Sequence, residues 1–168
     1  MALENSNGEQ PVLLLENIHK SYGDLEVLKV VRFSANRGDV IALIGSTGSR
    51  KSTLLRCANL LEIPQQGDII FEGEPVTWRM RRGERIPADE DQILKIRTNL
   101  SMVFQQFNLW AHMTILQTVI EAPVTVLGKE KSVAEEAGRA MLDKVGIGEK
   151  WDVYPAQLSG GQQQRAAI

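Results

Sequence analysis

The sequence lacks several features that would assign it to a particular class of protein. Cys57 is its only cysteine, so no disulfide bond can form within the chain. The longest apolar runs, such as 12–15 and 40–44, are far shorter than a membrane-spanning helix. The N-terminus has neither the positive region nor the apolar stretch of a signal peptide, so we expect a protein of the reducing cytoplasm.

Neither sign of charge dominates the composition. The 19 lysines and arginines nearly balance the 21 aspartates and glutamates, so overall charge points neither to nucleic acid nor to an acidic tail. The 168 residues leave room for about one domain, and 43% of them are hydrophobic while 24% are charged. This balance predicts a compact fold with a buried core, preceded by a flexible segment over residues 1–10.

The first half of the chain has the pattern of an α/β protein. Residues 12–20 and 27–35 are rich in β-branched side chains and flank a turn at 22–24, which predicts an antiparallel pair of strands. Residues 40–44 are continuously apolar, as in a strand that is covered on both faces in a parallel sheet. The elements expected next are a helix over 51–61, a strand over 68–71, a helix over 92–97 and a strand over 100–104.

A polar insert over residues 77–91 contains a cluster of arginines. Its members are Arg79, Arg81, Arg82 and Arg85. Clustered arginines can contact phosphates, and the alternative is a solvated hairpin or loop. We expect the solvated hairpin or loop.

The second half of the chain is helical in character. Apolar residues recur at helical spacing over 114–127, and Pro123 is expected to kink or end that helix. Ser132 and Glu135 have the spacing of a capping box that opens a second helix, which Gly146 would close. The apolar face predicted for the second helix consists of Val133, Ala137, Ala140, Met141 and Val145.

The segment between the predicted strand at 40–44 and the helix at 51–61 is close to the phosphate-binding pattern GxxxxGK[ST]. The candidate phosphate-binding residues are Gly45, Ser46, Thr47, Gly48, Ser49, Arg50, Lys51, Ser52 and Thr53. Consecutive backbone N–H groups at a helix N-terminus, together with the helix dipole, suit the phosphates of ATP. Lys51 would contact the β and γ phosphates and Ser52 would bind Mg²⁺, with a plain solvated lysine as the alternative for Lys51.

One position departs from the pattern, because Arg50 stands where glycine is expected before the lysine. If the backbone there has a positive φ, a side chain costs about 1 to 2 kcal/mol in conformational energy. The side chain would also have to leave the loop through space that the nucleotide needs. We therefore expect Arg50 to impair binding, against the alternative that its guanidinium helps to hold an anion.

A second anion-binding pattern lies at residues 158–165, Leu-Ser-Gly-Gly-Gln-Gln-Gln-Arg. Ser159 offers a hydroxyl, and Gly160 and Gly161 offer uncovered N–H groups at the start of a helix. Ser159 and Gln162 could also form a simple capping box, and the two roles are compatible. Together with the phosphate loop upstream, this segment resembles the signature motif of ABC transporters.

The resemblance implies a P-loop NTPase fold, with a RecA-like α/β core, an N-terminal antiparallel β subdomain and a helical subdomain. On this basis the nucleotide-binding core would cover 11–104, the helical subdomain 105–157, and the signature with the start of its helix 158–168. It further implies a head-to-tail dimer in which the phosphate loop of one copy and the signature of the other enclose ATP.

Two further residues take on roles only through the resemblance. Tyr22, in Lys-Ser-Tyr-Gly, is similar to the aromatic residue that stacks on adenine, with plain turn or core packing as the alternative. Gln105 is similar to the glutamine that contacts Mg²⁺ or the attacking water and joins the core to the helical subdomain. Lys51 and Gln105 are thus the candidate catalytic residues, and Ser52 and Gln105 the candidate metal ligands.

Four further segments point to a particular branch of this family. They resemble the ATP-binding subunits of bacterial importers for polar amino acids, of the histidine and octopine/nopaline type. The segments are 27–29, 54–57, 104–114 and 121–123. This resemblance implies membrane permease subunits as partners, a solute-binding protein as an indirect partner, and a peripheral place on the cytoplasmic face of the inner membrane. No nucleic-acid partner is expected. Val30 departs from the family pattern, which usually has glycine after Leu-Lys.

The alternative function is a degenerate and truncated ABC module that binds ATP poorly and does not hydrolyse it. Arg50 is one reason for it. The other is that the family's Walker B strand, D-loop and switch histidine would lie beyond Ile168, so the printed sequence alone could not complete a hydrolytic site.

Overall fold

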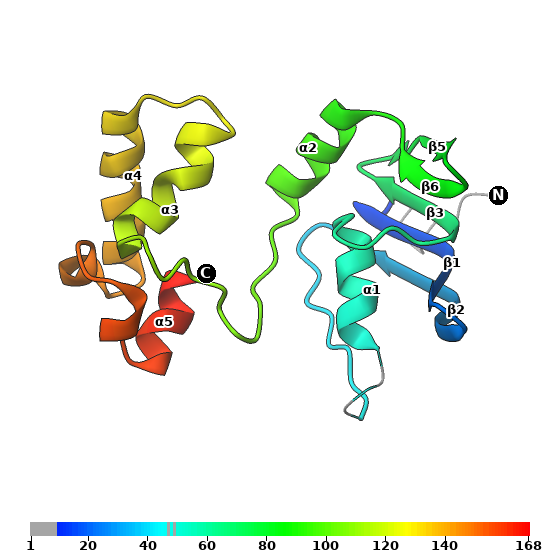
Figure 1. Cartoon of the computed structure of the whole chain (residues 1–168), viewed down its shortest axis with the longest axis horizontal. Helices are drawn as coiled ribbons and strands as arrows, with labels where there is room; N and C mark the ends of the chain where they lie inside the picture. Colours follow the sequence, from blue (N-terminus) through cyan, green and yellow to red (C-terminus); the bar gives the residue numbers. More distant parts are fainter. Residues whose placement is uncertain (1–9, 47, 49) are drawn as a thin grey trace. The chain divides into compact units, whose positions relative to one another are not determined.

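We describe a computed structural model of the chain over residues 10–46, 48 and 50–168. The predicted flexible segment 1–10 lies outside the described residues except for Gln10. The chain divides into two compact units, Met1–Ser101 and Met102–Ile168 (Figure 1).

The first unit is built on a four-stranded antiparallel sheet. Its strands are β1 (Leu13–Tyr22), β2 (Leu25–Ala35), β3 (Gln66–Phe71) and β4 (Glu74–Pro75), in the order β2-β1-β3-β4. The predicted hairpin is confirmed, because β1 and β2 pair antiparallel from Tyr22 with Leu25 to Leu13 with Ala35. Two helices, α1 (Lys51–Ala58) and α2 (Glu90–Asn99), complete this unit together with a small hairpin. The first predicted helix is therefore present but ends earlier than Leu61.

The core of the first unit joins this sheet to both helices. Leu15, Ile18 and Ile69 of the sheet are fully buried, and Cys57 of α1 and Ile96 of α2 pack in the same cluster. Burial of apolar surface stabilises a fold by about 25 cal/mol per Å². This cluster therefore holds α1 and α2 against the sheet.

The prediction of a buried strand at 40–44 is wrong. This segment has no regular secondary structure, and Val40 and Ile44 are 99% and 94% exposed. The predicted strand at 100–104 has no strand structure either. A strand needs a neighbour to pair its backbone N–H and C=O groups. No strand in the described ranges pairs with either segment, so their apolar sequences do not form sheet.

The polar insert folds as a hairpin of β5 (Trp78–Arg81) and β6 (Glu84–Pro87). The guanidinium of Arg85 lies 3.9 Å from the centre of the Trp78 ring, and its Nη1 donates a 2.8 Å hydrogen bond to the carbonyl oxygen of Gly67. Arg85 therefore attaches the hairpin to β3. Arg79, Arg81 and Arg82 are exposed, so the solvated hairpin is the alternative that the structure supports.

The second unit is helical. It contains α3 (Ile115–Thr125), α4 (Lys131–Lys144), the 3₁₀ turns η1 (Gly148–Lys150) and η2 (Pro155–Gln157), and α5 (Gly160–Ala166). Thr114 and Gln117 form a capping box at the start of α3, and Pro123 lies inside the helix two residues before its end. The core consists of Ile115, Leu116, Ile120, Ala134, Leu142, Ile147 and Leu158. No helix among the described residues combines the length and apolar character required to cross a membrane.

Two predictions about α4 are wrong. The helix begins at Lys131, and its N-cap is Glu130 without a side-chain hydrogen bond, so Ser132 lies within the first turn and forms no capping box. The buried face is also different: Ala134, Gly138 and Leu142 are buried, whereas Val133 and Met141 are 57% and 56% exposed.

Gly138 gives the physical reason for the change of face. A Cβ atom added at Gly138 would lie 2.9 Å from side-chain carbons of both Ile120 and Leu116, so α3 approaches α4 at the residue that has no side chain. Close backbone approach thus decides the packing in place of the larger apolar residues on the other face. The predicted end of the helix at Gly146 is confirmed, with a φ of 71° there.

Candidate nucleotide-binding site

The loop before α1 carries the predicted phosphate-binding residues. Thr47 and Ser49 lie outside the described residues. Gly45, Ser46 and Gly48 are exposed, and Gly48 has a φ of 83° with no atom within 4 Å of an added Cβ. Glycine is therefore favoured at position 48 by backbone conformation and not by lack of space.

Lys51 reaches back across this loop from the first residue of α1. Its Nζ donates hydrogen bonds to the carbonyl oxygens of Gly45, at 2.6 Å, and Ser46, at 3.1 Å. The ammonium group therefore lies over the loop, where a bound anion would meet it. Ser52 and Thr53 follow in the same turn, with Ser52 exposed.

The N-terminus of α1 suits an anion for a second reason. Its N-cap is Arg50, whose guanidinium side chain makes no capping hydrogen bond, so this residue places no side-chain acceptor over the first N–H groups of the helix. A lysine ammonium, a serine hydroxyl and the N–H groups of a helix N-terminus are all donors, and they fit the oxygen-rich phosphates of a nucleotide. A serine hydroxyl also suits Mg²⁺, which prefers oxygen ligands.

Arg50 has the left-handed backbone on which the sequence prediction was conditional, with φ 67° and ψ 17°. Its Nη1 donates a 3.3 Å hydrogen bond to the carbonyl oxygen of Val27 in β2. The side chain is thus attached to the sheet. Its expected effect on nucleotide binding stays a prediction.

Tyr22 lies at the end of β1 and is 45% exposed. The ammonium of Lys20 is 5.1 Å from the centre of its ring. Partial burial raises the pKa of the Tyr22 phenol, a hydrogen bond to the carboxylate of Glu62 raises it further, and a hydrogen bond with Thr53 acts in the opposite direction. The structure thus brings Tyr22 to Thr53, one of the predicted loop residues.

Lys20 and Glu62 were missed by the sequence analysis. Lys20 is 9% exposed, and its Nζ lies 2.8 Å from a carboxylate oxygen of Glu62. The hydrogen bond from Lys20 is the main reason that the pKa of Glu62 is lowered. One signal was present in the sequence: Lys20 is two residues before Tyr22 in a predicted strand, a spacing that places both side chains on one face.

The signature segment forms the predicted cap of α5. Ser159 is the N-cap, its Oγ accepts a 3.4 Å hydrogen bond from the N–H of Gln162, and the Gln162 side chain accepts a 2.9 Å bond from the N–H of Ser159. A Cβ added at Gly160 or Gly161 would have no atom within 4 Å. The capping box is confirmed, and contact of these residues with a phosphate stays a prediction.

The predicted site residues fall in both compact units. Tyr22 and the loop residues belong to the first unit, whereas Gln105 and the signature residues belong to the second. Gln105 is exposed in a turn that is closed by a 3.0 Å hydrogen bond from the N–H of Phe107 to the carbonyl oxygen of Phe104. Each unit therefore carries its own part of the candidate site.

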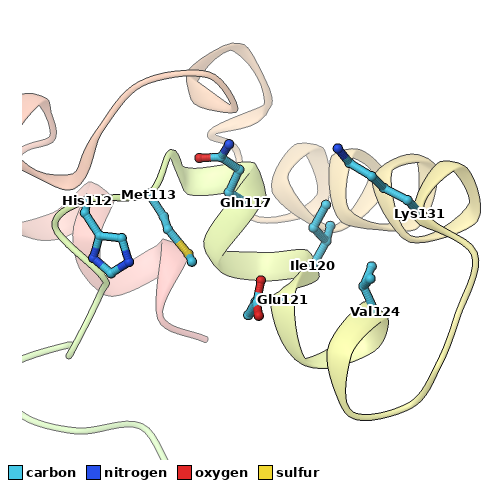
Figure 2. Close-up of a pocket in the computed structure, with 7 residues that line it drawn as sticks. All are labelled: His112, Met113, Gln117, Ile120, Glu121, Val124 and Lys131. Atoms are coloured by element: carbon cyan, nitrogen blue, oxygen red, sulfur yellow. The ribbon is translucent and has the colours of Figure 1, made fainter.

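The second unit also contains a pocket of about 450 Å³ (Figure 2). Met113, Ile120 and Val124 give it apolar walls, and Glu121 and Lys131 give it one charge of each sign. The adjoining Trp110 is 45% exposed, and its ring stacks on that of His112 with the centres 6.4 Å apart. An open apolar pocket beside an exposed tryptophan suits a protein partner.

Comparison with known proteins identifies the family. The family model described as "ABC transporter" matches residues 28–168. The chain belongs to the ABC transporter family. This agrees with the phosphate loop at 45–53 and the signature segment at 158–165, and it confirms the resemblance that these two motifs indicate.

Several curated ABC transporter proteins are similar to this chain. The octopine permease ATP-binding protein P of Rhizobium radiobacter is 50% identical over 163 residues, which are 96% of this chain and 62% of that protein. The arginine/ornithine transport ATP-binding protein AotP of Pseudomonas aeruginosa is 52% identical, with 93% and 62% of the two chains covered. HisP of Escherichia coli is 52% identical, with 90% and 60% covered. The chain thus spans about 60% of the length of these relatives.

Solved structures confirm the fold class. The ABC transporter component cbiO1 of Clostridium perfringens matches with a TM-score of 0.74 at 28% identity, covering 95% of this chain and 60% of that one. A dimeric ATP-binding cassette in a post-hydrolysis state with ADP and phosphate, MJ0796, matches with a TM-score of 0.72 at 28% identity, covering 92% and 66%. The chain therefore has the fold of an ABC nucleotide-binding cassette over the part that it spans.

Proposed function

We propose that this chain is part of the ATP-binding subunit of an importer for polar or basic amino acids, and that the subunit binds and hydrolyses ATP. The position of Lys51 carries the proposal, because its ammonium bridges the carbonyl oxygens of Gly45 and Ser46 at the N-terminus of α1. The substrate class is supported by relatives named for the transport of octopine, nopaline, arginine, ornithine, lysine and histidine.

The candidate site residues would act mainly by electrostatics. The α1 N-terminus and Lys51 would bind the phosphates, while Ser52 and Gln105 would hold Mg²⁺. The metal ion, when bound, neutralises phosphate charge. Positioning of a nucleotide in this way lowers the barrier to in-line attack by water. Tyr22 would stack on the adenine ring.

The signature residues suggest how two copies would cooperate. Ser159, Gly160 and Gly161 present a hydroxyl and open backbone at the start of α5. If these residues faced the phosphate loop of a second copy, they would contact the nucleotide bound at that loop from its opposite side. This supports a homodimer, and the relative MJ0796 is dimeric.

The pocket of the second unit suggests a site for a permease subunit. Its apolar walls and the exposed Trp110 suit a helix from a membrane protein. Through that contact the chain would lie peripherally on the cytoplasmic face of the bacterial inner membrane, with a solute-binding protein as an indirect partner. The subdomain limits 11–104, 105–157 and 158–168 are part of the same proposal.

Arg50 favours a second candidate function, in which the chain retains the fold and the permease contact but binds ATP weakly. Its left-handed backbone carries a side chain where the pattern has glycine. Weak binding by the parent chain and tight binding by an Arg50→Gly variant would favour this candidate.

Titration with ATP in the presence of Mg²⁺, followed by calorimetry, tests the proposal. We expect Lys51→Ala to weaken binding at least tenfold, because it removes a charged phosphate contact of about 1.5 to 3 kcal/mol. Lys29→Ala is the matched control, since Lys29 is an exposed lysine of β2 that lies outside the loop. Equal affinities of parent, Lys51→Ala and Lys29→Ala would reject the proposed site. Co-purification with amino-acid permease subunits tests the transport role separately.

A further inference from the structure

A network of polar groups connects the end of β1 to the residues that follow α1. Lys20 lies at its centre and makes three contacts through Nζ: with Glu62 at 2.8 Å, with the carbonyl oxygen of Ile63 at 2.9 Å, and with the ring of Tyr22 at 5.1 Å from its centre. Lys20 is 9% exposed, so its charge is largely removed from water. A buried ammonium is stable only when it is paired, and these contacts supply the pairing.

Tyr22 lies against this network. The ammonium of Lys20 lies over its ring, and Glu62 and Thr53 lie close enough to its phenol to shift the pKa of that group. The ring of a tyrosine at a strand end could otherwise rotate freely. Here the ammonium restricts the plane of the ring before any ligand binds.

We infer that Lys20 and Glu62 are positioning residues that hold the Tyr22 ring ready for an adenine base. The inference rests on the proposed function, because it assumes that Tyr22 meets the base of the nucleotide bound at the loop. The ammonium occupies one face of the ring, and a residue that is 45% exposed leaves room for a base on the other. Fixing the ring beforehand reduces the conformational entropy that base stacking would otherwise cost.

Thr53 gives the network a link to the phosphates. It lies two residues after Lys51 in the first turn of α1, close enough to the Tyr22 phenol to lower its pKa. The lysine that would bind phosphate and the threonine beside the ring therefore belong to one rigid helical turn. The spacing between the base and phosphate contacts is set by that turn.

A positioning role for Lys20 and Glu62 can be distinguished from a purely structural ion pair by comparing ligands with and without an adenine base. Loss of Lys20 or Glu62 should weaken binding of ligands that have an adenine base and leave binding of inorganic tripolyphosphate unchanged. Lys20→Met and Glu62→Gln each remove one charge and keep most of the side-chain volume. Removal of the cation over the Tyr22 ring, or of the carboxylate that pairs with this cation, should lower the affinity for ATP about five- to tenfold.

The experiment measures the affinities of ATP and of inorganic tripolyphosphate for the full chain and its variants by calorimetry. We expect Lys20→Met and Glu62→Gln to weaken ATP about five- to tenfold and tripolyphosphate not at all. Lys29→Met, an exposed lysine of β2, is the matched control and should change neither. In a Tyr22→Ala background, Lys20→Met should have no further effect, because the ring that it positions is gone.

The outcomes separate the two hypotheses. Equal weakening of both ligands, or an undiminished effect of Lys20→Met in the Tyr22→Ala background, would overturn the positioning role and leave the proposed function intact. Binding of neither ligand by the parent would overturn both. If Lys20→Met does not fold, as judged by circular dichroism, Glu62→Gln decides the matter, because glutamine keeps the side-chain volume and removes only the charge that pairs with Lys20.

Discussion

The guanidinium of Arg50 donates a hydrogen bond to the main-chain oxygen of Val27, with 3.3 Å between Nη1 and that oxygen. The bond is made although the backbone of Arg50 is left-handed, at φ 67°. One residue thus carries both an unfavourable backbone conformation and a tertiary hydrogen bond from the phosphate loop to β2.

Replacement of Arg50 by glycine should change affinity more than stability. Relief of the left-handed strain gains about 1 to 2 kcal/mol, and loss of the hydrogen bond to Val27 costs about 0.5 to 1.5 kcal/mol. We therefore expect the free energy of unfolding to change by less than about 1 kcal/mol. ATP affinity should rise by up to about tenfold, because the loop no longer carries the side chain. Calorimetric titration checks this, and identical affinities would show that Arg50 does not impair binding.

Val30 is another non-glycine residue with positive φ, at 51°, and it is β-branched, so this backbone conformation is strained there. It is 54% exposed, so little packing is lost on its removal. Val30→Gly should stabilise the chain by about 0.5 to 1 kcal/mol after the entropy cost of glycine is subtracted. Thermal melting should show a rise of about 2 to 4 °C.

Lys29→Gly is the control for this change, because Lys29 is its exposed neighbour and is not among the residues with positive φ. It should destabilise the chain by about 0.5 to 1 kcal/mol, since glycine weakens a strand that has ordinary backbone angles. A fall in melting temperature for both variants would mean that Val30 is not strained.

The contact of α4 with α3 at Gly138 should tolerate no side chain. Gly138→Ala places a Cβ atom 2.9 Å from both Ile120 and Leu116, so we expect a loss of about 1 to 3 kcal/mol from overpacking. Gly160→Ala is the matched change, because it meets no atom within 4 Å, and its stability should stay within about 0.5 kcal/mol of the parent. Urea unfolding measures both, and equal stabilities would contradict the packing.

The Lys20–Glu62 pair should make stability sensitive to acid. Because Lys20 lowers the pKa of Glu62 in the folded chain, the unfolded chain takes up the proton first, near pH 4.5, and the folded chain only at lower pH. The stabilisation is therefore complete above about pH 4.5 and is lost as the pH falls through the folded pKa. The difference in melting temperature between the parent and Glu62→Gln should shrink on acidification.

A background that lacks the lysine is the control for this titration. In Lys20→Met the main cause of the lowered pKa is absent, so Glu62→Gln should have a small effect that changes little with pH. A pH-dependent difference that persists in this background would assign the effect to a group other than the pair.

Features set by neighbouring residues in the sequence could be predicted. The turn before Leu25 and the cap formed by Ser159 and Gln162 follow from local patterns. Each depends on a few adjacent backbone groups, so the sequence contains the necessary information. The family also follows from two short motifs for the same reason, and the comparison confirms it.

Features that depend on distant partners could not be predicted in the same way. Residues 40–44 have the composition of a buried strand, but strand structure requires a pairing neighbour that the described residues do not provide. On α4 the larger apolar residues favoured one face, whereas the close approach of α3 at Gly138 selects another. The Lys20–Glu62 pair was missed because its members are far apart in sequence and meet only after α1 packs on the sheet.

The exposed segment 40–44 has a consequence for handling the protein. Val40 and Ile44 are almost fully exposed, and Ile41 is 44% exposed, in a run with strong preference for extended structure. Such a run can recruit the same segment of another molecule into intermolecular sheet, which makes it a nucleus for aggregation. Ile44→Lys should therefore reduce light scattering of concentrated samples, and unchanged scattering would place the nucleus elsewhere. A charge at that single position would act as a gatekeeper against self-association.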